Sequence, residues 1–140
     1  MKFDTYAINS TLKKNLEAQG LIRPTDIQYK AIPSILKGED VLAIAQTGTG
    51  KTVAFAVPVI DTVINLKRTK KNSGIQSIIM VPTRELAVQI QDVFIALCRK
   101  TRITPFAVFG GVEQDKQIQT LLKGVDILIA TPGRMFDLIS

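Results

Sequence analysis

The segment Ala45-Gln46-Thr47-Gly48-Thr49-Gly50-Lys51-Thr52 decides the fold, because the residues before this loop have the pattern of a strand and those after it the pattern of a helix. An apolar run precedes it at residues 41–44, and a helical pattern begins near Thr52. A strand, a glycine-rich turn and a helix in this order are the setting in which such a loop binds phosphate. The glycines let backbone N–H groups point inward, and the helix N-terminus adds partial positive charge. The alternative is a glycine-rich turn that only changes the direction of the chain.

Two side chains of this segment carry its predicted chemistry. Lys51 supplies a full positive charge for the outer phosphates of a nucleotide, and the Thr52 hydroxyl supplies a ligand for Mg²⁺. We therefore expect Lys51 and Thr52 to be the catalytic residues of this stretch, with Thr52 as the metal ligand. The first position departs from the general pattern, which has glycine where this chain has Ala45.

The composition limits the function further. The net charge of +6 over 140 residues suits a polyanionic partner, although nucleotide binding or solubility would also explain it. The chain has no histidine, which excludes histidine-dependent triads and histidine metal sites, and its single Cys98 excludes an internal disulfide. No apolar run has the length of a signal peptide or a membrane span, so we expect a cytoplasmic protein without a membrane anchor.

The pattern of apolar residues predicts one α/β domain over residues 1–140, with a parallel sheet flanked by helices. Residues 1–36 are expected to form two helices, and residues 41–140 the sheet with its crossover helices. Strands are expected at 41–44, 77–81, 104–109 and 126–130. Helices are expected at 9–19, 25–36, 52–66, 86–97, 113–123 and 133–139. In the helix at 113–123, Ile118, Leu121 and Leu122 are expected to face inward.

Local signals refine these elements. Thr25 and Gln28 have the spacing of a capping box, in which a hydroxyl and an amide bind free N–H groups at a helix start. Pro33 should kink its helix or end it early, and Pro58 should bend the helix that follows the loop. The charged stretch 67–74 reads as a solvated connector or, alternatively, as a nucleic-acid contact.

The segments that follow the predicted strands should meet at one edge of the sheet, where ligands bind in parallel α/β sheets. Arg84 and Arg134 each follow a strand and precede a helix, so a guanidinium and free helix N–H groups can together hold a phosphate. Gly110 and Gly111 allow a nucleic-acid backbone to approach closely. The alternative is ordinary turn glycines, with the arginines paired to carboxylates such as Glu85.

These segments together resemble the first RecA-like domain of DEAD-box ATP-dependent RNA helicases, in particular bacterial ones. The matching segments, in order, are residues 20–28, 45–52, 82–87, 110–111 and 131–134. In that family alanine is usual at position 45, which explains the departure noted above. Two positions still differ from the family pattern: Leu21 is usually aromatic, and Asp26 is often proline.

The resemblance implies ATP and Mg²⁺ as cofactors and RNA as a partner bound through its backbone. Gln28 would read the adenine edge, Phe3 would stack on the base, and Arg23 lies in the same nucleotide-binding segment. The remaining implied nucleotide ligands are Ala45, Gln46, Thr47, Gly48, Thr49, Gly50, Lys51 and Thr52. The implied RNA-contacting residues are Thr83, Arg84, Gly110, Gly111, Thr131, Gly133 and Arg134.

The catalytic carboxylates of that family have no counterpart in this sequence. Asp40 and Asp126 each precede a predicted strand, which puts them at the opposite edge from Lys51. The resemblance implies that the Asp-Glu-Ala-Asp strand and a second RecA-like domain lie beyond Ser140, so we expect the chain alone to lack hydrolysis and to expose an apolar edge beside the phosphate-loop strand. Two other readings remain open: a small-molecule kinase or GTPase that uses the same loop, and a non-catalytic RNA-binding module.

Overall fold

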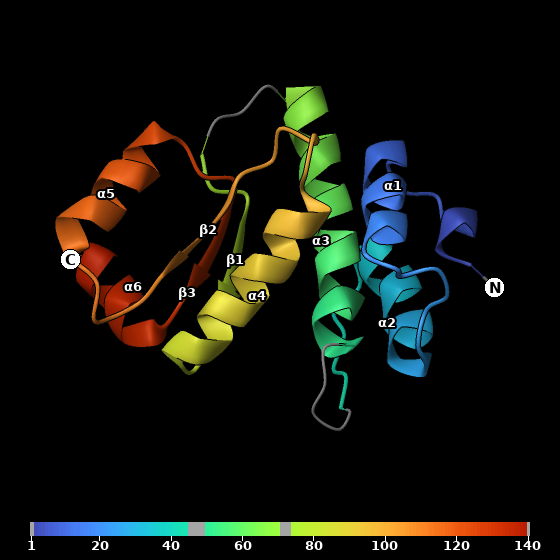
Figure 1. The fold of residues 1–140 in the computed structure, drawn as a ribbon, viewed down its shortest axis with the longest axis horizontal. Coiled ribbons are helices and arrows are strands. Elements are labelled where there is room, and N and C mark those ends of the chain that lie inside the picture. The colour runs from blue at the N-terminus through green and yellow to red at the C-terminus, as the bar shows by residue number, and fades with distance from the viewer. Residues whose placement is uncertain (1, 45–49, 71–73, 140) are drawn as a thin grey trace.

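The computed structural model describes residues 2–44, 50–70 and 74–139 of the chain (Figure 1). In these ranges three parallel strands form one sheet: β1 (Ser77–Met80), β2 (Pro105–Val108) and β3 (Ile127–Ala130). Their order is β1-β3-β2, so β3 lies in the centre, and Leu128 is in register with both Ile78 and Phe106. The predicted fold class, a parallel sheet flanked by helices, is confirmed.

The helices connect the strands and cover both faces of the sheet. After a short 3₁₀ turn at Phe3–Thr5 they are α1 (Ser10–Ala18), α2 (Asp26–Leu36), α3 (Gly50–Lys70), α4 (Arg84–Leu97), α5 (Gln114–Lys123) and α6 (Pro132–Ile139). The capping box predicted from Thr25 and Gln28 is present at the start of α2. Pro33 does not end α2, because the helix continues to Leu36. The predicted loop at 67–74 is wrong for its first part, since α3 continues to Lys70.

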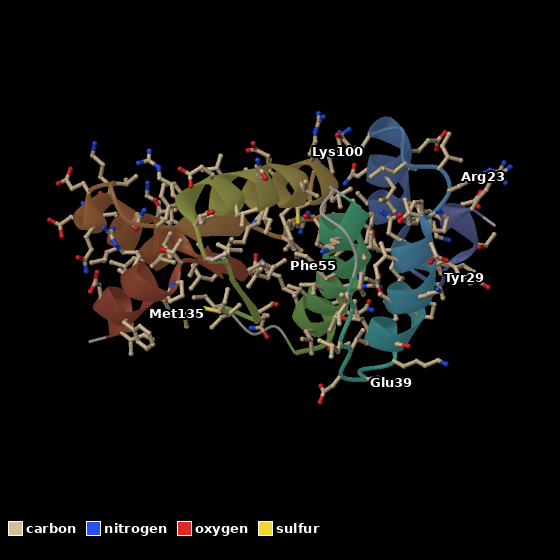
Figure 2. The ribbon with its side chains drawn as sticks, turned by 90° about the horizontal axis from the view of Figure 1, so that it is seen from below. Arg23, Tyr29, Glu39, Phe55, Lys100 and Met135 are labelled. Carbon is tan, nitrogen blue, oxygen red and sulfur yellow. The ribbon has the colours of Figure 1, made fainter. Side chains whose placement is uncertain are left out.

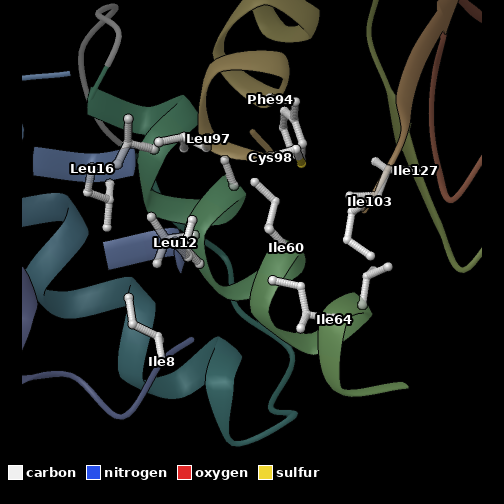
Figure 3. Close-up of a cluster of buried hydrophobic side chains, with 14 of the residues drawn as sticks. Ile8, Leu12, Leu16, Ile60, Ile64, Phe94, Leu97, Cys98, Ile103 and Ile127 are labelled. Carbon is white, nitrogen blue, oxygen red and sulfur yellow. The ribbon is translucent and has the colours of Figure 1, made fainter. Parts of the chain in front are cut away.

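The main core lies where α1, α3 and α4 meet one face of the sheet (Figure 3). Leu12, Ile60, Phe94 and Ile127 contribute fully buried side chains from four different elements. Each such side chain stabilises the fold by about 1.5–3 kcal/mol through the hydrophobic effect. Cys98 belongs to this core, and burial raises the pKa of its thiol to about 12. A thiol with so high a pKa is a small apolar core residue and not a nucleophile.

A second, smaller cluster covers the other face of the sheet. It joins Val108, Leu128 and Ala130 to Met135 and other apolar side chains of α5 and α6. The central strand is therefore covered from both sides, and all four of its residues are buried. Among the described residues no helix is long and apolar enough to span a membrane.

The strand predicted at residues 41–44 is wrong. The structure describes these residues as an irregular segment, and Leu42 and Ile44 are 89% and 86% exposed. A strand needs a neighbour to bind its backbone N–H and C=O groups, and none of the described strands lies beside this run. An exposed apolar edge, which the sequence predicts, is present at β1 instead, where Ile78 and Met80 are about half exposed.

Candidate functional site

The carboxyl ends of the three strands form one edge of the sheet, and the loops that leave them stay in contact with it. Thr131 donates its N–H to the Val108 carbonyl (3.2 Å), and Val81 donates to the Ala130 carbonyl (3.0 Å). In Figure 1 the first turns of α3, α4 and α6 lie toward the lower end of the molecule, below the strands. This arrangement directs the free N–H groups of three helix starts to the same edge.

At this edge the structure describes only the last part of the predicted phosphate loop, because Ala45, Gln46, Thr47, Gly48 and Thr49 lie outside the described residues. Helix α3 begins at Gly50, so Lys51 and Thr52 lie in its first turn, and both are half-buried. Lys51 lies at the wall of a mostly apolar cavity of about 370 Å³ between α2, α3 and residues 41–43. No carboxylate of the described residues lies within 4.0 Å of its ammonium group.

Gln28 joins the start of α2 to the start of α3. Its side chain is 2% exposed; Oε1 accepts a hydrogen bond from the Thr25 N–H (3.0 Å), and Nε2 donates to the Gly50 carbonyl (3.1 Å). An amide can make four hydrogen bonds, so one N–H and one lone pair stay available for a further partner. The amide predicted to read adenine therefore lies beside the first residue of α3.

Phe3 and Arg23 lie in different surroundings. The Phe3 ring is 2% exposed and packs against Tyr6, with ring centroids 6.1 Å apart. A base could stack on this ring only after it was uncovered, so these contacts give no support to the predicted adenine contact of Phe3. Arg23 is exposed and lies at the outer surface (Figure 2).

Arg84 is the exposed cation at the start of α4. Its guanidinium carbon lies 5.3 Å from the centroid of the Phe109 ring, within the range of a cation–π interaction. No ion pair with Glu85 is present within 4.0 Å, so the alternative in which that carboxylate neutralises Arg84 does not apply in this structure. The preceding residue, Thr83, caps the helix by accepting the Leu86 N–H at 3.2 Å.

Gly111 makes room for this arginine. Its φ is +84°, and a Cβ atom built on it would lie 2.8 Å from Nη1 of Arg84. The positive φ is therefore what requires glycine here, and a Cβ atom would in addition make the flexible end of the Arg84 side chain move aside. At Gly110 neither demand exists, because no atom lies within 4 Å of a Cβ built there and its φ is not positive.

These two neighbouring glycines provide a matched pair of substitutions. Gly111→Ala is expected to lower the free energy of unfolding by about 1–2 kcal/mol, the cost of a left-handed conformation for an L-residue. Gly110→Ala, the control, should change it by less than about 0.5 kcal/mol. Urea unfolding followed by circular dichroism measures both values. Equal effects of the two substitutions would contradict the role assigned to Gly111.

Arg134 does not lie open at the edge as Arg84 does. It is half-buried, and its Nη1 donates to the Val112 carbonyl (3.1 Å) and to Oε1 of Gln117 (2.8 Å). Gln117 in turn donates from Nε2 to the Phe109 carbonyl (3.2 Å). Both ends of the loop that holds Gly110 and Gly111 are thus fixed by one buried network. The Nε of Arg134 is buried and has no partner among the described atoms.

The prediction for α5 is confirmed for Leu121, which packs against the smaller cluster, and is wrong for the two other residues. The sequence suggested that Ile118, Leu121 and Leu122 face inward, but Leu122 is 82% exposed and Ile118 is 37% exposed. The buried residue of α5 is Gln117, at 3% exposure. Sequence reasoning missed both Gln117 and Phe109, because a glutamine in a polar helix and an aromatic residue at a strand end give no local signal of these contacts.

The other predicted residues also lie around the edge. Thr131 is half-buried at the end of β3, and Gly133 is exposed in the first turn of α6. Among the described residues no group of three or more acidic, cysteine or histidine side chains is arranged to hold a metal ion. The Thr52 hydroxyl, in the first turn of α3, is an oxygen of the kind that can bind Mg²⁺.

Comparison with known proteins supports the resemblance seen in the sequence. The family profile described as DEAD/DEAH box helicase matches residues 25–140. The chain is 42% identical over 135 residues to the DEAD-box ATP-dependent RNA helicase RhpA of Helicobacter pylori, covering 96% of this chain and 26% of that protein. It is 40% identical over 140 residues to the ATP-dependent RNA helicase dbp3 of Sclerotinia sclerotiorum, covering 100% of this chain and 23% of that protein.

Nearly the whole chain is also similar to solved structures, among them these two. A DEAD box protein from the hyperthermophile Methanococcus jannaschii has a TM-score of 0.87 at 37% identity, covering 98% of this chain and 36% of that one. A hypothetical ATP-dependent RNA helicase from Sulfolobus tokodaii has a TM-score of 0.81 at 31% identity, covering 94% and 36%. The chain thus spans about a quarter of the length of the curated relatives it matches.

Proposed function

This chain belongs to the DEAD/DEAH box helicase family, and from that premise we propose that it is the part of an ATP-dependent RNA helicase that binds ATP and the RNA backbone. The relatives are named ATP-dependent RNA helicases, and the chain covers about a quarter of each. ATP hydrolysis and duplex unwinding are therefore proposed for the whole protein, in which a second RecA-like domain completes the site.

The nucleotide half of the proposal rests on the start of α3. Lys51 is a cation without a carboxylate partner among the described residues, beside free helix N–H groups. The Gln28 amide donates to Gly50 and keeps one N–H and one lone pair for an adenine edge, which must uncover this side chain, 2% exposed, before it can bind. We assign the triphosphate to segment 45–52, a Mg²⁺ ligand to the Thr52 hydroxyl and the adenine to Gln28. Phe3 and Arg23 stay in this proposal as residues near the adenine base.

The RNA half rests on the observation that carries the proposal: Arg84, Gly111 and Arg134 converge on one short loop at the same edge. The two arginines have different tasks. Arg134, joined to Val112 and Gln117, fixes the loop, whereas Arg84 is exposed and offers its guanidinium to a phosphate. Thr83, Gly110, Thr131 and Gly133 line the same edge. Contacts of this kind position an RNA strand without reading its sequence.

Hydrolysis requires groups beyond these. It needs a carboxylate that orients the attacking water and an arginine from a facing domain, besides the phosphate loop and the metal. We propose that the second RecA-like domain supplies that arginine when ATP and RNA draw the two domains together. A cytoplasmic setting, expected from the sequence, is part of the same proposal.

Removing Arg84 tests the RNA half. Arg84→Ala is expected to weaken binding of a single-stranded oligouridine about tenfold, and the slope of log K against log salt should fall by about 0.7 for one lost phosphate contact. Fluorescence anisotropy at several salt concentrations measures both quantities. Lys14→Ala, which removes a positive charge from the exposed side of α1, is the control and should change the affinity by less than about twofold. An unchanged slope in Arg84→Ala would overturn the assignment of Arg84.

A competition experiment tests the nucleotide half. ATP with Mg²⁺ should displace a fluorescent adenine nucleotide from the chain, whereas GTP should not, because the Gln28 amide suits the donor and acceptor of adenine. Equal displacement by GTP would favour a GTPase or small-molecule kinase over a helicase.

A further inference from the structure

A second concave, positively charged surface lies at the other end of α3 and α4. There a pocket of about 470 Å³ is lined by Lys67, Arg68, Lys100 and Arg102, together with the start of α1. On α3, Lys67 and Lys51 are separated by about 24 Å, given a rise of 1.5 Å per residue. Figure 2 shows Lys100 just beyond the end of α4, beside α1. This pocket is therefore separate from the edge that carries Lys51 and Arg84.

The charge of this pocket is not neutralised by its own walls. No aspartate or glutamate lines it, and of its four cations only Lys67 has a carboxylate partner, Asp126 at 3.2 Å. In the described chain no carboxylate lies within 4.0 Å of the charged groups of Arg68, Lys100 or Arg102. A concave surface with excess charge of one sign concentrates the field and attracts ions of the opposite sign.

Two of these cations occupy strained backbone positions. Lys100 and Arg102 have φ values of 61° and 66°, and they are the only described residues other than glycine with positive φ. Glycine would adopt this conformation without the clash that a Cβ atom causes. The chain nevertheless has a long cationic side chain at both positions. Strained positions of this kind cluster at functional sites, where the surrounding structure holds them.

The surroundings of this turn do hold it firmly. The Asp126 carboxylate accepts the Thr104 N–H at 2.8 Å, and the Lys67 ammonium donates to the Arg102 carbonyl at 3.1 Å. On the other side, the Asn15 amide donates to the Arg99 carbonyl at 2.7 Å. These hydrogen bonds hold the turn from both sides, and Lys100 and Arg102 line the wall of the pocket.

We propose that this pocket is a second phosphate-binding site, which takes the clustered phosphate groups of an RNA strand or of a small polyphosphate. Charged guanidinium and ammonium groups bind phosphate oxygens through charge-assisted hydrogen bonds. Thr11 on the same wall adds a hydroxyl, whereas the Thr101 hydroxyl already donates to the Cys98 carbonyl. The site does not depend on the edge that holds Lys51, and so it can be tested with that edge disabled.

The test uses the chain with Lys51→Ala and Arg84→Ala, so that the phosphate loop and the exposed arginine of the sheet edge contribute as little as possible. Two probes distinguish the sources of phosphate: inorganic tripolyphosphate, and a single-stranded oligouridine of about twelve nucleotides. Calorimetry measures the first and fluorescence anisotropy the second. Two double variants remove the charges: Lys100→Gln with Arg102→Gln keeps the strained backbone, and Lys100→Gly with Arg102→Gly relieves it. Lys14→Gln with Lys30→Gln removes two exposed charges outside the pocket and is the control.

Both pocket variants are expected to bind tripolyphosphate about tenfold more weakly than the control. The glycine variant should melt at the same temperature as the starting chain or higher, which separates lost binding from lost folding. If binding of the oligouridine also weakens, and the slope of log K against log salt falls by about 1.4, the natural ligand is RNA. If only tripolyphosphate weakens, the ligand is a small polyphosphate. Binding of both probes within twofold of the control, or no binding to the starting chain at millimolar concentration, would overturn the proposal.

Discussion

Replacing Lys51 by alanine is expected to weaken the binding of ATP with Mg²⁺ by about a hundredfold, because one cation serves the outer phosphates in a half-buried setting. Its ammonium group has no carboxylate partner among the described residues, and one side of it faces an apolar cavity. Low local polarity strengthens its attraction for a phosphate. The substitution should leave the fold intact, since alanine is the best helix former and Lys51 lies in the first turn of α3.

Isothermal titration of ATP with Mg²⁺ into the two chains measures this effect. Lys30→Ala is the matched control, because it removes the same side chain from another helix, where its only ion pair is the exposed one with Asp26 at 3.1 Å. It should leave the affinity within about twofold. A Lys51→Ala chain that bound ATP as tightly as the control would refute the assignment of the triphosphate to segment 45–52, and the glycine-rich segment would then be only a turn.

Local signals in the sequence predicted most of the secondary structure. Two examples are the capping box of Thr25 and Gln28 and the periodic apolar residues of α4. Both depend on residues close together in the sequence, and both are present in the folded chain. Pairing between strands is different. Residues 41–44 and β3 are both short apolar runs, yet β3 has a neighbour on each side and residues 41–44 have none among the described strands. The composition of a short apolar run does not determine whether neighbouring strands pair with it, so the two runs look alike in the sequence.

The candidate site also has one part that local sequence signals could predict and another part that they could not. Arg84 and the Gly110–Gly111 loop follow strand ends, and the rule for parallel sheets brings such residues to one edge. The roles of Gln117 and Phe109 depend on contacts between separate elements, for which the sequence has no local sign. The turn at Lys100 and Arg102 was even harder to predict from the sequence. Positive φ is usually signalled by glycine or asparagine, but here the positions are Lys100 and Arg102.

Asp126 connects the sheet to that turn, and its removal is expected to have the largest effect on stability. Its carboxylate is 7% exposed, accepts the Thr104 N–H and binds Lys67 at 3.2 Å. Asp126→Ala leaves the partly buried Thr104 N–H without this partner and Lys67 without its counter-ion. The expected loss is about 3 kcal/mol, the lower end of the range for a broken buried pair, because the Lys67 side chain is 38% exposed and water can solvate it.

Urea unfolding with linear extrapolation measures this loss, and two further variants separate its causes. Asp126→Asn keeps an oxygen for the Thr104 N–H and removes only the charge, so it should cost about half as much. Asp26→Ala breaks the exposed ion pair with Lys30 and should cost less than about 1 kcal/mol. A loss below about 1 kcal/mol would mean that the turn does not depend on this carboxylate, and that Lys100 and Arg102 are held by the contacts of Asn15 and the helix ends.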